Sequence, residues 1–404
     1  MRERQGRVQV RSTSWVGRVR LGGADVIVRP KLAGLEPGLV RMLEAVGGLG
    51  RLSRLPVQRT LSIGATGGLF DLLAVLLAEE VVRLAREGLN VGYDVREEDL
   101  AVVRGTIAIR DQALRHFGRA APLACRFEEL DQQTPENELL LTALAAAADL
   151  CRSPEARSLA RRVFSELEEQ VGVRERPRST SVLREIVPPG TSEARRDLHR
   201  YRNAIELAWL LLEHQVVDRP LALGPARSFA FLMDMNVLFE RYLTRWLAAR
   251  LRPHGLRVRA QSSRLALRDV ATRRPVGNIK PDVLVSAQGD RALAIDAKYK
   301  RYAGSTERHV VHAPMSDLTQ ALLYAQVYGG LLTPRRTLLV FPTETSTVSP
   351  RSLELRDSAG TSERIRVDII PFPLSRALEG GPEPMLDQFE RSILTACGRQ
   401  AALG

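Results

Sequence analysis

The chain has 404 residues, 44% of them apolar and 26% charged, proportions typical of a globular protein with more than one domain. Its formal net charge of +12 favours polyanions, so nucleic acid is the leading class of partner; arginine-rich composition without that meaning is the alternative. Three widely spaced cysteines argue against a disulfide framework or a zinc site, and the longest apolar stretch, 69–77, is too short to span a bilayer. We therefore expect a cytoplasmic protein that needs no membrane.

The predicted elements alternate between strand-rich and helical parts. Alternating residues predict strands at 15–21 and 24–29, and again within 91–109 and at 337–341. A stretch rich in Pro, Arg, Ser and Thr at 174–192 predicts a loop. Apolar residues at helical spacing, with Pro and Gly at the ends, predict helices at 37–46, 69–86, 136–150, 155–169, 194–217, 233–251 and 315–328. Asp218-Arg219-Pro220 interrupts the helical pattern and marks a domain boundary.

The candidate site lies on two predicted strands near residue 290. Pro281-Asp282 opens the first strand, and Asp296-Ala297-Lys298 closes the second, with a hairpin turn at 288–290 between them. Because side chains alternate along a strand, Asp296 and Lys298 should point to the same side. Two carboxylates and an ammonium gathered in this way suit a Mg²⁺-dependent phosphodiesterase: the ion takes oxygen ligands, polarises the phosphate and lowers the pKa of a bound water.

Lysine is scarce in this chain, which strengthens the interpretation. Only four of the 59 basic residues are lysines, and three of them, Lys280, Lys298 and Lys300, fall in this one stretch. An ammonium is a compact charge that arginine does not replace, so we expect Lys298 to have a role of its own. It would orient the attacking water and neutralise charge that builds up on phosphorus. Alternating charges on an exposed strand are the structural alternative.

Two neighbouring helices offer supporting groups. Gln320 and Tyr324 stand at i and i+4 on the helix after the strands, hence on one face, where Gln320 could hold a water or phosphate. Glu240, on the preceding helix, is a possible third acid and metal ligand. For each helix an ordinary amphipathic or solvated helix face remains an equal alternative.

The motifs together resemble the PD-(D/E)xK nuclease superfamily and, more narrowly, the McrC family, the nuclease subunits of McrBC-type modification-dependent restriction systems. The resemblance extends to Val28-Arg29-Pro30-Lys31, to Val103-Arg104-Gly105, and to Cys125–Leu130 followed by Thr134-Pro135-Glu136-Asn137. Thr106 stands where the family pattern has an arginine. The resemblance implies an N-terminal β-rich partner-docking domain (1–125), a helical linker region (126–220) and a C-terminal restriction-endonuclease-like domain (221–404), within an α+β or α/β fold whose mixed central sheet is flanked by helices.

The resemblance also implies roles and partners. Asp282 and Asp296, with Glu240 in support, would bind Mg²⁺ or Mn²⁺, while Lys298, with Gln320, would assist catalysis. The expected partners are double-stranded DNA and a McrB-like AAA+ NTPase, a hexamer that this subunit stimulates in anti-phage defence. A non-catalytic adaptor with a vestigial nuclease fold, and a nuclease that acts without a motor, are the alternatives. No Walker-type loop is present, since the glycines at 64–68 lack the required lysine, so nucleotide hydrolysis is left to the partner.

Overall fold

The computed structural model describes residues 2–4, 7–9, 14–21, 24–30, 36–47, 57–172, 177–213, 215–216, 229–261, 264–287, 292–300, 313–329, 334–344, 349–355, 365–380 and 384–398. They form two compact units. The sheet unit comprises residues 1–57 and 232–404, and the helical unit comprises residues 58–231. None of the described helices combines the length and the apolar character that a membrane span requires.

These units divide the chain differently from the three consecutive stretches expected from the sequence, 1–125, 126–220 and 221–404. The reason is that the first 57 residues belong with the C-terminal part. The amide of Met235 donates a hydrogen bond of 2.9 Å to the carbonyl of Ser14, and helix α1 (Glu36–Gly47) packs against α9 (Met235–Leu251). A local sequence pattern does not reveal that the N-terminal residues pack against the C-terminal part of the chain.

The centre of the sheet unit is a mixed six-stranded sheet in the order β10-β13-β14-β15-β17-β16. Strand β14 pairs with β13 in antiparallel fashion but with β15 in parallel, and β15 is also parallel to β17. The sheet therefore has the mixed character expected from the sequence. Its strands are β10 (Arg257–Ala260), β13 (Val283–Ser286), β14 (Ala292–Ala297), β15 (Arg335–Thr343), β16 (Arg351–Leu355) and β17 (Ile365–Pro373).

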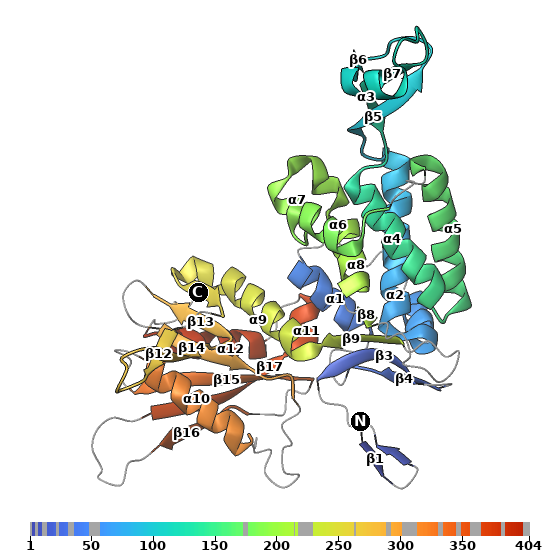
Figure 1. The fold of residues 1–404 in the computed structure, drawn as a ribbon. Coiled ribbons are helices and arrows are strands. Elements are labelled where there is room, and N and C mark those ends of the chain that lie inside the picture. Colours follow the sequence, from blue (N-terminus) through green and yellow to red (C-terminus); the bar gives the residue numbers. More distant parts are fainter. Residues whose placement is uncertain are drawn as a thin grey trace. The chain divides into compact units, whose positions relative to one another are not determined.

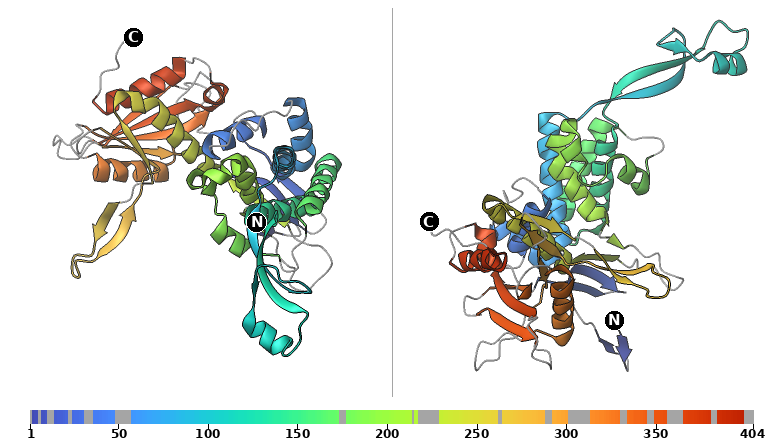
Figure 2. Two further views of the ribbon diagram at one scale, coloured as in Figure 1. Left: turned by 90° about the horizontal axis from the view of Figure 1, so that it is seen from above. Right: turned by 90° about the vertical axis from the view of Figure 1, so that its left-hand side faces the viewer.

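Helices cover both faces of this sheet, because its central strands carry apolar side chains on both sides. On one face, Leu339 and Phe341 of β15 pack with Ala321 of α10 (Met315–Tyr328). On the other face, Phe372 of β17 contacts the rings of residues on α9 and α12 (Pro384–Ala396), with centroids 5.2–6.3 Å apart: Phe239, Tyr242, Trp246 and Phe389. Figure 2, left, shows the orange α10 and the red α12 on opposite sides of the sheet.

The remaining elements of the sheet unit lie outside this sheet. Strand β3 pairs with β4, β1 with β2, and β11 with β12, each pair antiparallel. Their bounds, with those of the short helices, are β1 (Arg2–Arg4), β2 (Arg7–Gln9), β3 (Trp15–Leu21), β4 (Ala24–Val28), η2 (Arg252–His254), β11 (Arg264–Arg268), β12 (Pro275–Ile279) and α11 (Leu374–Glu379). Strand β9 (Phe229–Asp234) crosses from one unit to the other.

The helical unit consists of packed helices and a long arm. The arm is formed by β5 (Gly92–Leu100), β6 (Thr106–Ile107), α3 (Ile109–Arg115) and β7 (Leu123–Asp131), and it extends from the helices as a cyan ribbon in Figures 1 and 2. The other elements are α2 (Val57–Glu87), α4 (Pro135–Leu150), α5 (Pro154–Val171), α6 (Thr180–Ile186), α7 (Thr191–Ala194), η1 (Arg196–Tyr201), α8 (Arg202–Glu213) and β8 (Gln215–Val216).

Hydrogen bonds of the buried Asn137 fasten the base of the arm to the helices. The side-chain amide of Asn137 donates to the carbonyls of Asn90 (3.0 Å) and Gln132 (2.7 Å), and it accepts from the Tyr201 hydroxyl (2.8 Å). Thr134 caps α4 by accepting from the amide of Asn137. The Thr-Pro-x-Asn pattern therefore has a structural purpose: it joins both strands of the arm to one helix end.

The stretch 174–192, predicted as a loop, contains two short helices in its described part, and that prediction is wrong there. Ser179 caps α6 by accepting from the amide of Val182, and Leu183 is buried, so a short amphipathic turn is stable despite the polar composition. The predicted helix at 69–86 begins after a break at Gly68 (φ 75°, ψ −163°), although helical residues precede it from Val57. The helix predicted at 194–217 starts as a 3₁₀ helix and ends at Glu213.

Candidate functional site

The two acids lie where β13 and β14 meet. Val283 pairs with Ile295, so Asp282, directly before β13, comes opposite Asp296 in β14. The amide of Ala297 donates to Oδ2 of Asp282 over 2.8 Å and fixes that carboxylate. The turn predicted at 288–290 lies outside the described residues, but the strand pairing that it would connect is present. The hairpin thus brings the two carboxylates to one place.

Lys298 points to the same side of β14 as Asp296, as the alternation of strand side chains predicts. Its Nζ donates to Oδ1 of Asp296 (3.1 Å) and lies 3.0 Å from Oδ2. Nζ also donates to Oε1 of Gln320 over 3.0 Å. The ammonium is therefore held between an acid of the sheet and an amide of helix α10, with only 17% of its side chain exposed.

Burial dominates the electrostatics of the two acids. The side chain of Asp296 is fully buried, and this raises its pKa to about 7; the nearby charge of Asp282 adds to the effect and Lys298 opposes it. The pKa of Asp282 is raised as well, first by burial and then by the charge of Glu240. Although Oδ2 of Asp296 lies beside the ammonium, it is buried without a hydrogen bond. One anionic oxygen therefore keeps capacity for another positive partner.

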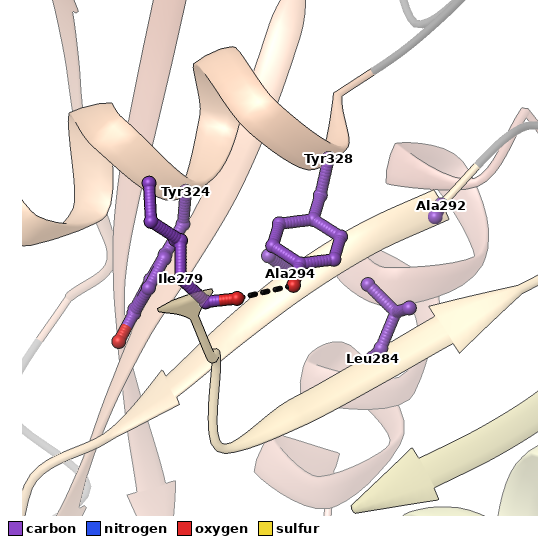
Figure 3. Packing of buried hydrophobic residues seen from close by; sticks show 6 residues of the cluster. All are labelled: Ile279, Leu284, Ala292, Ala294, Tyr324 and Tyr328. Carbon is purple, nitrogen blue, oxygen red and sulfur yellow. Dashed lines mark hydrogen bonds between the residues drawn. The ribbon is translucent and has the colours of Figure 1, made fainter. Parts of the chain in front are cut away.

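Helix α10 clamps the segment that leads into Asp282. The hydroxyl of Tyr328 donates to the carbonyl of Ile279 (2.5 Å), a contact drawn in Figure 3, and the hydroxyl of Tyr324 donates to the carbonyl of Lys280 (3.0 Å). Gln320, one turn before Tyr324, donates to that hydroxyl over 2.7 Å. The i and i+4 pairing predicted for Gln320 and Tyr324 is therefore present, and it links Lys298 to the backbone before Asp282.

Sequence reasoning gave no role to Gln261, which joins the third acid to the site. Its side-chain amide donates to Glu240 (2.9 Å) and accepts from Nζ of Lys280 (2.7 Å), while its backbone amide donates to the carbonyl of Asp282 (2.9 Å). Gln261 has φ 46°, a left-handed conformation unusual for glutamine. The scarcity of lysine had already drawn attention to Lys280, but no signal in the sequence pointed to Gln261 as its partner.

A sequence model of the McrBC 5-methylcytosine restriction system component matches residues 10–342, most of the chain. This protein belongs to the McrBC restriction family. No curated protein is similar enough to count as a relative. Among solved structures, a chain of the half-complex from a tetradecameric assembly of Thermococcus gammatolerans McrB AAA+ hexamers with bound McrC is 17% identical; the match covers 97% of this chain and 86% of that one, with a TM-score of 0.61.

That similarity shows a shared fold. A chain of the Thermococcus gammatolerans McrBC complex is 18% identical, over 59% of this chain and 67% of that one, with a TM-score of 0.39.

In this McrBC family member, further contacts surround the acids. Lys300 pairs with Asp317 at 2.9 Å, which ties the segment after β14 to the start of α10, and Asn236 accepts from the amide of Tyr299 (3.1 Å). These contacts anchor the site to α9 and α10.

The donor set suits a small, hard cation. Mg²⁺ takes oxygen ligands, retains several waters and needs only one or two carboxylates. Asp282 and Asp296 supply these, and the buried Oδ2 of Asp296 lacks a hydrogen bond. Within the described residues, no group of three His, Cys, Asp or Glu side chains is arranged to hold an ion. Glu240 accepts a hydrogen bond from Gln261, and its role as a third metal ligand stays a prediction.

The hydroxyl of Tyr324 connects two parts of this site, and removing it should be measurable. Burial raises its pKa to about 12, so it stays a donor at any working pH. We expect Tyr324→Phe to lower the free energy of unfolding by about 1 kcal/mol, because Gln320 and the carbonyl of Lys280 lose a partner. Urea denaturation would measure this. Tyr93→Phe, at an exposed position on the arm, is the control, and equal effects of both variants would contradict the assigned connection.

Proposed function

We propose that this chain is the metal-dependent DNA endonuclease subunit of a McrBC-like restriction complex, which hydrolyses phosphodiester bonds when bound to an AAA+ NTPase that it stimulates. The observation that carries the proposal is the meeting of Asp282, Asp296 and Lys298 on paired strands, with a buried carboxylate oxygen left without a hydrogen bond. Membership of the McrBC family and the net charge of +12 are consistent with a duplex DNA substrate.

Asp282 and Asp296 would hold Mg²⁺ or Mn²⁺, and the bound ion would supply positive charge to the scissile phosphate. Side chains of the protein would stabilise the charge that develops during hydrolysis. Lys298, held by Asp296 and Gln320, presents an ammonium that stabilises negative charge developing on phosphorus. Gln320 cannot swing freely, because Tyr324 accepts from its amide, so the ammonium is positioned before DNA arrives.

The arm of the helical unit is the proposed docking surface for the AAA+ partner. Helix α3 has no buried residue, and Ile109 and Phe117 are 79% and 86% exposed. Further large apolar side chains are exposed along the arm: Tyr93, Val95, Val102, Val103, Ile107, Leu114 and Leu130. So much exposed apolar surface on one extended element is typical of a protein interface. It lies largely within the stretch 1–125 that the sequence analysis assigned to partner docking.

Substitution of Asp296 or Lys298 should separate DNA cleavage from stimulation of the partner. We expect Asp296→Asn and Lys298→Ala each to reduce DNA cleavage at least about 100-fold, since each removes charge needed in the transition state. Stimulation of NTP hydrolysis by the AAA+ partner should remain. The measurement is cleavage of modified and unmodified duplexes with partner and Mg²⁺ present. Asp387→Asn, an exposed carboxylate of α12, is the matched control.

Phe117→Asp is the converse variant, expected to abolish stimulation of the partner while Mn²⁺ binding persists; Val182→Asp, on α6 of the same unit, is its control. Should wild type with partner and Mg²⁺ stimulate NTP hydrolysis but never cut any duplex, the adaptor function replaces the nuclease. Cleavage without any partner would favour the stand-alone nuclease.

Metal binding should depend on pH, because the pKa of Asp296 is raised to about 7 by burial and by Asp282. Below that value the carboxyl is largely protonated, and an ion must displace the proton. We therefore expect Mn²⁺ affinity to rise nearly tenfold per pH unit between pH 5 and 7 and to level off above pH 7, with protons released on binding. Calorimetry in buffers of different ionisation enthalpy measures both quantities. Affinity that is constant from pH 5 to 8 would contradict the raised pKa.

A further inference from the structure

A two-stranded hairpin leaves the sheet unit close to the candidate site. Strands β11 and β12 pair with one another and form a sheet of their own. In Figure 2, left, the hairpin extends away from the rest of its unit as a yellow ribbon. Three of its apolar side chains face solvent, whereas Ile279 at its base is buried: Leu267 is 57% exposed, Val276 68% and Val270, at the tip, 91%. The hairpin makes little contribution to the core, so its sequence needs another explanation.

The charge of this segment is strongly one-sided. Residues 264–280 contain four arginines and one lysine but a single acid, Asp269. The side chains of Arg268, Arg273 and Arg274 are exposed around the tip. The amide and hydroxyl of Thr272 donate to the carboxylate of Asp269 at 2.5 and 2.7 Å and hold its pKa below the usual range, so Asp269 stays ionised and offsets one of these positive charges. The surface of the hairpin is therefore complementary to a polyanion.

The tip has a defined shape rather than an arbitrary one. The amide of Asp269 donates to the carbonyl of Arg274, and the amide of Arg273 donates to the carbonyl of Asp269, both over 2.9 Å. Arg273 has φ 58°, a left-handed conformation that non-glycine residues rarely adopt. Because the backbone of the turn is held in this way, it loses little backbone entropy when its arginines bind a ligand.

Both ends of the hairpin run into the candidate site. Gln261 precedes β11, and Lys280 directly follows β12. The side chain of Gln261 joins Lys280 to Glu240, while its backbone amide donates to the carbonyl of Asp282. Ile279, the last residue of β12, is fixed by Tyr328 (Figure 3). A molecule that binds along the hairpin would therefore lie close to the carboxylates of Asp282 and Asp296.

We propose that the β11–β12 hairpin is a DNA-binding ribbon that holds the duplex beside Asp282 and Asp296. The proposal rests on the nuclease function proposed above and names the element that grips its substrate. A two-stranded ribbon fits the major groove of B-DNA, arginines at its rim contact phosphates, and an apolar tip can contact base edges. Gln261 and Lys280, which contact each other, then connect the DNA-bound hairpin to the backbone at Asp282.

The charge of the ribbon is tested by Arg268→Gln/Arg274→Gln, which leaves the left-handed Arg273 in place. Binding of the full-length chain to a 30-base-pair duplex is followed by fluorescence anisotropy, in Ca²⁺ to avoid cleavage, over a series of salt concentrations. We expect binding about tenfold weaker and a salt slope smaller by about two, with Mn²⁺ affinity unchanged. Arg161→Gln/Arg162→Gln, an exposed pair on α5, is the matched control and should bind like wild type.

The ribbon proposal is overturned if the hairpin variant binds DNA as wild type does, or if wild type binds no duplex. Failure of the nuclease proposal looks different: wild type binds DNA through the hairpin but never cuts it, with or without the partner.

Proximity is tested by a photo-crosslinker attached to Val270→Cys. The three native cysteines are buried, so the new thiol at the tip is the selective target. We expect ultraviolet light to couple the tip to duplex DNA, with Val182→Cys on α6 as the control that does not couple. Coupling to the AAA+ partner in the assembled complex, with none to DNA, would make the hairpin a protein-docking element and overturn the proposal.

Discussion

Two carboxylates and an ammonium, brought together where β13 and β14 meet with Asp296 fully buried, are the constraint around which the sheet unit is organised. Burying Asp296 next to Asp282 is unfavourable in itself, because burial raises the pKa of both carboxyls and the charge of Asp282 raises that of Asp296 further. Lys298 offsets part of this penalty, since its Nζ lies 3.1 Å from Oδ1 and 3.0 Å from Oδ2 of Asp296. Such an arrangement is poor for stability and well suited to binding a cation.

The surrounding structure holds these electrostatically unfavourable side chains in place. Strand β14 lies inside the sheet, between an antiparallel and a parallel neighbour, so the backbone on both sides of Asp296 is fixed. Helix α10 reaches across with Gln320, Tyr324 and Tyr328, whose hydrogen bonds hold Lys298 and the segment before Asp282. Functional groups on a rigid sheet, supported by a second layer of hydrogen bonds, are preorganised for the charge that develops in a reaction.

The parts of the site that follow a local period could be predicted from the sequence. Alternation along β14 placed Lys298 beside Asp296, and the helical repeat placed Gln320 beside Tyr324. The role of Gln261 could not be predicted in this way. It depends on a left-handed backbone at one residue and on partners at Glu240 and Lys280, which are distant in sequence. No local pattern encodes that convergence.

The fold shows the same limit. Most long helices were predicted close to their observed bounds, because their apolar periodicity is strong. The return of residues 1–57 to the C-terminal part, the short helices within 174–192 and the independent β11–β12 hairpin were not predicted. The return depends on contacts between distant segments, the short helices on single caps, and a hairpin without a core leaves only weak periodicity.

The most direct test of a shared cation at Asp282 and Asp296 is anomalous diffraction from crystals of the protein grown with Mn²⁺. An anomalous peak about 2.0–2.2 Å from a carboxylate oxygen of both residues, lost in Asp296→Asn, is the expected result. A peak bound elsewhere, or carboxylates too far apart to share one ion, would contradict the proposed centre.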